Sequence, residues 1–269
     1  MSTEKDMREN PFTDEYWKAE LSAYGLRKSK FHVEHVSVDW VEPEGRLDDY
    51  LNVNWRIDMV PLPRLGVNGH TWMSLTPMEI QSAALAIHRA KGVVISGGLG
   101  LGYFAIRAAA KPEVKEVIVF EKEPLVIEWF RRAFKGRIEL EKIKIVEGDM
   151  RKTCKGYTAN FAFVDIYPDC LADGTFSDVK LLRRKNTIKR YMFWGYEKIV
   201  LALMVNKLLK YGTLVLGNDL VSYLRHWRDT PYTPGKPSDG TLGNYYRPQD
   251  SPPLELIRAG KRVMQDFPW

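Results

Sequence analysis

Four segments of the sequence end in residues that suit a nucleotide site. The first is the turn GGLGLG, which contains Gly98, and three later apolar segments are followed by Glu121, Asp149 and Asp165. Glycine in a turn lets a ligand approach the main chain closely. A carboxylate accepts hydrogen bonds from ribose hydroxyls or from an amine. The set therefore predicts a site for a nucleotide-like cofactor.

The spacing of the glycines separates two kinds of nucleotide turn. A dinucleotide-binding turn has the pattern G-x-G-x-x-G, but Tyr103 stands where the third glycine would follow Gly98 and Gly100. The pattern G-x-G-x-G, completed by Gly102, is present instead. A phosphate-binding P-loop needs Gly-Lys-Ser or Gly-Lys-Thr, which this turn lacks.

Short apolar strands that alternate with helices must position these residues. Strands are predicted at GVVIS, VKEVIVFE, IKIVEGD and NFAFVDIYPD, and helices begin at YFAIRAAA and PLVIEWFRRAF. Such alternation predicts an α/β fold with a doubly wound, mostly parallel, Rossmann-like sheet. Ligands of these sheets bind outside the carboxyl ends of the strands, so the four polar positions are expected along one edge.

A small antiparallel β-unit is expected before this sheet. The segments FHVEHVSVDWVE and YLNVNWRIDMV alternate apolar and polar residues, as half-buried strands do, with EPEGRLDD as a turn between them. The segment VPLPRLGVNGH is interpreted as a Pro- and Gly-rich turn. A helix is predicted from Ser74 to Ala90, because TPME forms a capping box.

The predicted organisation has two parts. An arm and the small β-unit occupy residues 1–73, and a cofactor-binding domain occupies 74–269. The second part includes a predicted helix EKIVLALMVNKLLKYG and a predicted strand TLVLGND. It also contains a long loop, rich in Pro and Gly, at 229–253.

A family resemblance joins these motifs. The ordered set ISGGLGLG, VIVFEKEP, VEGDM and FAFVDIYPD resembles the motifs of class I S-adenosylmethionine-dependent methyltransferases, and most of all their spermidine-synthase-like branch. The resemblance covers about residues 50–220. It implies S-adenosylmethionine as the cofactor and a methyl group transferred to an acceptor.

The resemblance also implies which residues form the site. The turn would pass the methionine moiety, Glu121 would hold the ribose and Asp149 would contact the adenine amine. The implied cofactor-binding set is Gly97, Gly98, Leu99, Gly100, Gly102, Glu121, Lys122, Gly148, Asp149, Met150 and Asp165. The implied catalytic set is Asp165, Tyr167 and Asp169, with Asp165 positioning or deprotonating the acceptor. No metal site is predicted.

Two positions depart from the family pattern. Ser96 stands where many methyltransferases carry an acidic residue. Aminopropyltransferases show D-x-x-D at the fourth strand, whereas here Pro168 stands at the second acidic position and the next carboxylate is Asp169. Aminopropyl transfer from decarboxylated S-adenosylmethionine is therefore the alternative. A protein that binds or degrades the cofactor without a separate acceptor is a further one.

Composition leaves the acceptor open. The net charge is +6, and the basic run Lys180 to Arg190 is interpreted as a solvated helix face, so a small molecule, a protein, a nucleic acid or another anionic partner all remain candidates. The two cysteines, Cys154 and Cys170, form no CxxC pair, which is typical of a reducing compartment. No apolar run approaches the length of a membrane span. A cytoplasmic protein is expected, and the resemblance makes a homodimer reasonable.

Overall fold

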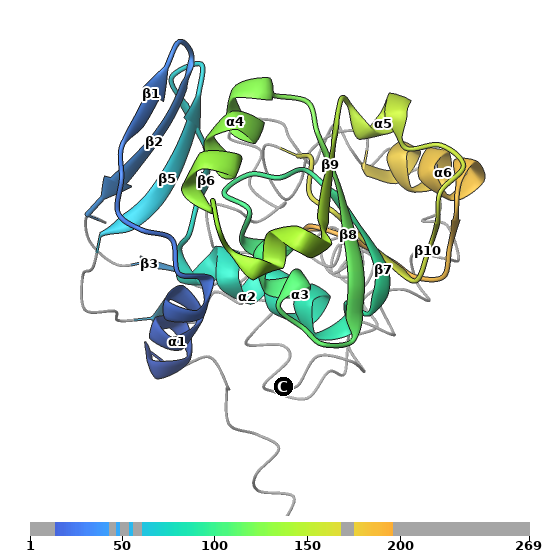
Figure 1. The fold of residues 1–269 in the computed structure, drawn as a ribbon, viewed down its shortest axis with the longest axis horizontal. Helices are drawn as coiled ribbons and strands as arrows, with labels where there is room; N and C mark the ends of the chain where they lie inside the picture. Colours follow the sequence, from blue (N-terminus) through green and yellow to red (C-terminus); the bar gives the residue numbers. More distant parts are fainter. Residues whose placement is uncertain (1–13, 43–46, 49–53, 56–60, 168–174, 196–269) are drawn as a thin grey trace, which may run out of the picture. The chain divides into compact units, whose positions relative to one another are not determined.

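The computed structural model describes residues 14–42, 47–48, 54–55, 61–167 and 175–195. These residues form two principal sheets, each made of strands that lie side by side (Figure 1). The first helix, α1 (Asp14–Tyr24), precedes both sheets in the chain. All described helices and strands fall in one compact unit, which comprises Pro11–Pro168 and Gly174–Trp194.

The larger sheet is parallel throughout and has the order β13-β11-β7-β8-β9. The central strand β7 (Gly92–Gly97) lies between β11 (Phe161–Val164) and β8 (Val114–Glu121). The edge strands are β9 (Ile143–Glu147) and β13 (Tyr191–Phe193). Strands buried on both faces need continuous apolar runs, and β11 is buried along its whole length. The predicted α/β class with a parallel, Rossmann-like sheet is confirmed.

Helices alternate with the strands of this sheet along the chain. The predicted helices are α2 (Pro77–Arg89), which precedes β7, α3 (Tyr103–Ala109) and α4 (Pro124–Ala133). The 3-10 helix η2 (Ile138–Lys142) and α5 (Met150–Thr153) were not predicted, and α6 (Thr175–Lys185) holds part of the basic run. The start of α2 shows why this helix could be predicted from its sequence. Thr76 accepts a hydrogen bond from the backbone N–H of Glu79 at 3.4 Å, and Pro77 occupies the first turn.

The smaller principal sheet is antiparallel, as expected, but its strands differ from the prediction. Its order is β1-β2-β5-β6, with β1 (Phe31–Val33), β2 (Val36–Val41), β5 (Leu62–Val67) and β6 (His70–Ser74). The segment FHVEHVSVDWVE is therefore a hairpin, whose turn places Glu34 at φ +49°. Two further short strands, β3 (Leu47–Asp48) and β4 (Asn54–Trp55), pair with each other.

The segment VPLPRLGVNGH was wrongly interpreted as a turn, because it contains the whole of the strand β5. Pro63 is the second residue of β5, near the strand end where a missing backbone donor is tolerated. The turn itself is limited to Asn68 and Gly69, whose φ values of +52° and +76° suit a two-residue hairpin loop. The Asn-Gly step was a hairpin signal, and the neighbouring prolines obscured it.

The basic and aromatic stretch after 180 was not assigned a strand, yet it supplies two. The first, β12 (Thr187–Ile188), pairs with β10 (Thr158–Ala159), and β13 pairs with β11. The predicted helix EKIVLALMVNKLLKYG, the strand TLVLGND and the loop at 229–253 lie outside the described residues. Within the part that the structure describes, no helix is long and apolar enough to cross a membrane.

Candidate cofactor site at the carboxyl edge of the parallel sheet

The register of the central strands brings the predicted site residues to one edge. Gly97 of β7 is aligned with Phe120 of β8 on one side and with Val164 of β11 on the other. The backbone N–H of Asp165 donates to the carbonyl of Gly97 at 2.8 Å, and that of Gly98 donates to Phe120 at 2.9 Å. The glycine turn, the end of β8 and the end of β11 therefore adjoin one another.

Packing within the protein accounts for two glycines of the turn. Gly98 has φ +84°, and a β-carbon there would collide with the carbonyl oxygen of Asp165. Gly102, with φ +78°, lies against the ring of Phe130. A side chain at either position would force the turn away from β11 or from α4. These glycines thus hold the turn close to the strand end that carries Asp165.

Glu121 ties the turn to the end of β8. One carboxylate oxygen, Oε2, accepts the backbone N–H of Leu99 at 2.9 Å, and Oε1 accepts that of Glu123 at 2.9 Å. The side chain is only 9% exposed. A carboxylate has about four lone-pair positions, so each oxygen keeps one acceptor position for a ligand hydroxyl. The role in ribose binding that the resemblance implies is compatible with these two bonds.

The residues after β9 form the next part of the edge. The backbone N–H of Gly148 donates to the carbonyl of Glu121 at 2.7 Å. Asp149 was expected to close the strand, but it caps α5 by accepting the backbone N–H of Arg151 at 2.9 Å. Met150 is buried, and its sulfur lies against Gly97. Asp149 is thus held in place by its own helix, while Met150 packs beneath the turn.

Asp165 has the surroundings of a proton acceptor. It directly follows β11 and is half-buried. Desolvation disfavours the charged carboxylate and raises the pKa of Asp165 from its ordinary value to about 7. A carboxyl group with such a pKa can exchange a proton with a ligand near neutral pH.

Tyr167 belongs to a cluster that the sequence did not reveal. Its hydroxyl donates to Oδ2 of Asp178 at 3.1 Å. The guanidinium of Arg151 donates to the same carboxylate, with Nη2 at 3.0 Å from Oδ2, and lies over the Tyr167 ring. Asp178 is buried, so its charge is matched by a cation and a hydroxyl. The cluster joins α5, α6 and the segment after β11, and Tyr167 is buried within it.

The hairpin of β5 and β6 also reaches the turn, which was not expected. The sulfur of Met73 accepts the backbone N–H of Leu101 at 3.2 Å. The neighbouring Trp72 is partly exposed, and Nζ of Lys122 lies 5.2 Å from the centre of its ring. Met73 and Leu101 are 28 residues apart, so the local pattern of apolar and polar residues could not predict their contact.

The remaining predicted positions have simple surroundings. Ser96, where an acidic residue is common in the family, donates its hydroxyl to the carbonyl of Gly98 at 3.0 Å. Gly100 has φ +51°, and a β-carbon there would lie 2.7 Å from the sulfur of Met73. Asp169, the third predicted catalytic residue, lies outside the described residues. The other predicted cofactor-binding residues therefore adjoin the turn, the end of β8 or the start of α5.

No protein-family model and no curated protein matches the chain. Solved structures do resemble it, with identities of 14–19% and TM-scores of 0.32–0.37. A precorrin 8w decarboxylase of Methanobacterium thermoautotrophicum has 19% identity over 42% of this chain and 59% of its own, with a TM-score of 0.32. A precorrin-6y C5,15-methyltransferase of Geobacter metallireducens has 14% identity over 57% of this chain and 71% of its own, with a TM-score of 0.35. A probable spermidine synthase of Corynebacterium glutamicum has 15% identity over 58% of this chain and 57% of its own, with a TM-score of 0.37.

These structures include the two kinds of enzyme whose motifs the sequence resembles, methyltransferases and spermidine synthases. The matched region spans about three fifths of the decarboxylase chain. At such identities the resemblance concerns the fold, and it does not identify what this chain binds or converts.

Proposed function

We propose that the protein binds S-adenosylmethionine and transfers its methyl group to an acceptor. One observation carries the proposal: Glu121 is bonded to the glycine turn, and Asp165, whose pKa is about 7, follows the neighbouring strand at the same edge. A ligand held at this edge would meet a hydroxyl-binding carboxylate and a proton acceptor together.

The donor and acceptor chemistry of the edge fits this cofactor. Glu121 retains acceptor positions for ribose hydroxyls after its two backbone bonds. Asp149, fixed as the cap of α5, offers a carboxylate to an adenine amine. The glycine turn between them lets a ligand lie close to the main chain.

Asp165 would act on the acceptor. When bound, S-adenosylmethionine supplies a methyl group already activated by a positively charged sulfur. Glu121 and the glycine turn would hold this cofactor, whose methyl group would pass to a nitrogen or oxygen of the acceptor while the electron pair of the broken bond stays on sulfur. The proton of the acceptor passes to Asp165, because a group with a pKa near 7 is an effective base near neutral pH.

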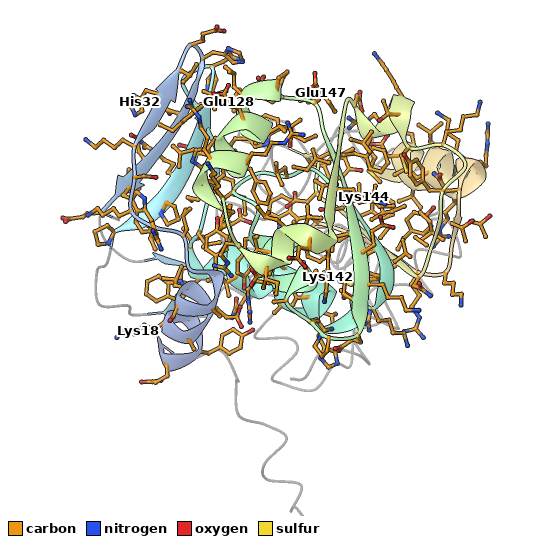
Figure 2. All side chains as sticks on the ribbon, in the orientation of Figure 1. Lys18, His32, Glu128, Lys142, Lys144 and Glu147 are labelled. Carbon is orange, nitrogen blue, oxygen red and sulfur yellow. The ribbon has the colours of Figure 1, made fainter. Side chains whose placement is uncertain are left out.

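Calorimetric titration of the full chain with S-adenosylmethionine, S-adenosylhomocysteine and decarboxylated S-adenosylmethionine tests the proposal. Binding of the first two is expected, and Glu121→Ala should weaken it at least about tenfold, as loss of charge-assisted hydrogen bonds does. Glu128→Ala is the matched control, since Glu128 is an exposed residue of α4 (labelled in Figure 2) whose carboxylate pairs with Arg132 on the same helix.

Each other outcome of the titration has a defined meaning. Preference for the decarboxylated ligand would favour aminopropyl transfer. Turnover of bound S-adenosylmethionine without any acceptor would favour a cofactor-degrading protein. If none of the three ligands binds, the proposed cofactor is wrong.

A further inference from the structure

Basic side chains gather on the surface formed by α5, α6 and the segment that leads into β13. Between 151 and 195 the sequence has nine Lys and Arg residues against four Asp residues, which accounts for nearly all of the net charge of +6. We call the following six exposed side chains the basic surface: Lys152, Lys155, Lys180, Arg184, Lys189 and Arg190. Nitrogen-tipped side chains surround this part of the fold (Figure 2).

Hydrogen bonds to backbone carbonyls bring the three segments of the basic surface together. Nζ of Lys185, near the end of α6, donates to the carbonyl of Arg151 in α5 at 2.8 Å. The backbone N–H of Gly156 donates to the carbonyl of Lys185 at 2.9 Å. The side chain of Asn186 donates to the carbonyl of Cys154 at 3.1 Å, and β12 follows directly. The charges therefore lie in one region.

Helix α6 turns a strongly basic face to solvent. Val179 and Leu182 are buried, while Lys180 and Arg184, one turn apart, are exposed on the opposite side. Like charges at this spacing repel each other and destabilise a helix by a few tenths of a kcal/mol. The dipole of α6 favours cations in its last turn, which accounts for Arg184 but not for Lys180 or Lys189. An anionic partner would relieve this repulsion.

A lipid surface is a poorer partner for this region than a polyanion in solution. Proteins that lie on membranes insert large apolar side chains beside their basic residues. Among the described residues, the large exposed hydrophobic side chains are Trp72 and Ile138, and neither lies between 151 and 195. Nucleic acid needs no such insertion, because its phosphates present closely spaced negative charges along a strand.

We propose that the basic surface binds the phosphate backbone of nucleic acid. The proposal goes beyond the proposed function, because binding through this surface requires neither the cofactor nor Asp165. Nucleic acid would become the acceptor class only if the methyl transfer proposed above also holds.

Fluorescence anisotropy of the full chain without cofactor provides the test. The probes are single-stranded RNA, single-stranded DNA and duplex DNA of about 20 nucleotides, longer than a typical single-strand binding site. Binding is expected at low salt, and the logarithm of the association constant should fall linearly with the logarithm of the salt concentration. The three probes show whether RNA or DNA is the source of the phosphates.

The test variant is Lys180→Glu/Arg184→Glu/Lys189→Glu. Its affinity for the preferred probe should be at least about tenfold lower, and its salt slope should fall by about two to three, since each lost phosphate contact removes roughly 0.7–0.9. The neutralising variant Lys180→Gln/Arg184→Gln should show a smaller loss in the same direction. It keeps the test informative if the charge reversal prevents folding, which thermal melting followed by circular dichroism checks.

The matched control is Lys91→Glu/Lys115→Glu/Lys135→Glu, which reverses three exposed charges elsewhere and gives the same net charge as the test variant. Its affinity should change less than about threefold, because distant charges are largely screened. Equal losses in both triple variants would contradict a localised surface. Absence of binding to every probe, or binding to phosphatidylserine vesicles and not to nucleic acid, would overturn the proposal.

Discussion

At the scale of single residues, the surroundings of Asp165 change its chemistry. Burial raises the pKa of Asp165 to about 7, so in the folded chain it keeps its proton at pH values where the unfolded chain has released it. The folded state therefore binds more protons than the unfolded state between about pH 4 and pH 7. Across that window Asp165 makes folding less favourable as the pH rises.

Replacement of Asp165 by asparagine should separate its two effects. The free energy of unfolding of wild type, relative to Asp165→Asn, is expected to fall with rising pH by at most about 1.4 kcal/mol per pH unit between about pH 4 and pH 7. Turnover of the variant should be lower by about 100-fold or more. Urea denaturation and a pH series of initial rates measure these quantities. Parallel stability curves for the two proteins would contradict the raised pKa.

Gly98 and Gly136 allow backbone strain to be separated from collision. Both have φ +84°, but a β-carbon on Gly136 would meet open space, whereas one on Gly98 would meet the carbonyl oxygen of Asp165. Gly136→Ala should cost about 1–2 kcal/mol for the left-handed backbone alone. Gly98→Ala should cost more, and denaturant unfolding measures both. Equal losses would show that the turn moves freely away from Asp165.

At the scale of elements, the cluster around Asp178 decides how α5 and α6 sit against the segment after β11. Arg151 binds Asp178 from α5, and Tyr167 binds it from the segment after β11. Because Asp178 is buried, loss of either partner leaves part of its charge unmatched. Asp149 and Asp165 each lie two residues from a member of this cluster, Arg151 and Tyr167 respectively.

The cluster predicts coupling between Tyr167 and Asp178. Tyr167→Phe should cost about 1 kcal/mol of folding free energy, and a double-mutant cycle with Asp178→Asn should give a coupling energy of similar size. Denaturant unfolding of the four proteins measures it. A coupling energy near zero would mean that the hydroxyl has another role.

Activity of the same variant bears on the predicted catalytic role of Tyr167. Tyr191→Phe is the matched control, because its hydroxyl also donates one hydrogen bond, to the carbonyl of Leu182 at 3.1 Å, and neither residue is a predicted site residue. If Tyr167→Phe reduces turnover no more than Tyr191→Phe at equal folded fraction, Tyr167 only positions the site. A selective loss of turnover would support its predicted place in catalysis.

At the scale of the molecule, segments far apart in the sequence are joined next to the glycine turn. The hydroxyl of Tyr24, at the end of α1, donates to the carbonyl of Leu101. Glu20 of the same helix accepts the hydroxyl of Tyr103 at 2.8 Å and binds Arg107 of α3. In addition, His35 of the β1–β2 turn contacts Glu123 after β8. The arm thus supports the turn from outside the parallel sheet.

Removal of the Glu20 charge should loosen this support. Glu20→Gln leaves the partly buried guanidinium of Arg107 with a weaker partner, and a loss of about 1–3 kcal/mol of folding free energy is expected. Hydrogen exchange should become faster in α1. Lys144→Ala is the control, because its pair with Glu116 lies at the surface and should change stability by less than about 1 kcal/mol. Unchanged exchange in α1 would contradict the anchoring role.

Much of the fold was predictable because its signals are local. The apolar runs of β7, β8, β9 and β11 are bounded by turn residues, and the cap of α2 requires only neighbours in sequence. Strands that were missed had weak local signals. β5 contains a proline, and β13, with three residues, is too short to show a period.

The sequence by itself determined the succession of β7, β8, β9 and β11 along the chain and which polar residues follow them. Since parallel strands end at one edge, it also predicted that Glu121 and Asp165 approach the glycine turn. Only the tertiary structure decided that Arg151 binds Asp178, that Met73 lies on the turn, and that desolvation raises the pKa of Asp165. These features depend on contacts between distant segments and on exclusion of water, and neither has a counterpart in the local pattern of residues.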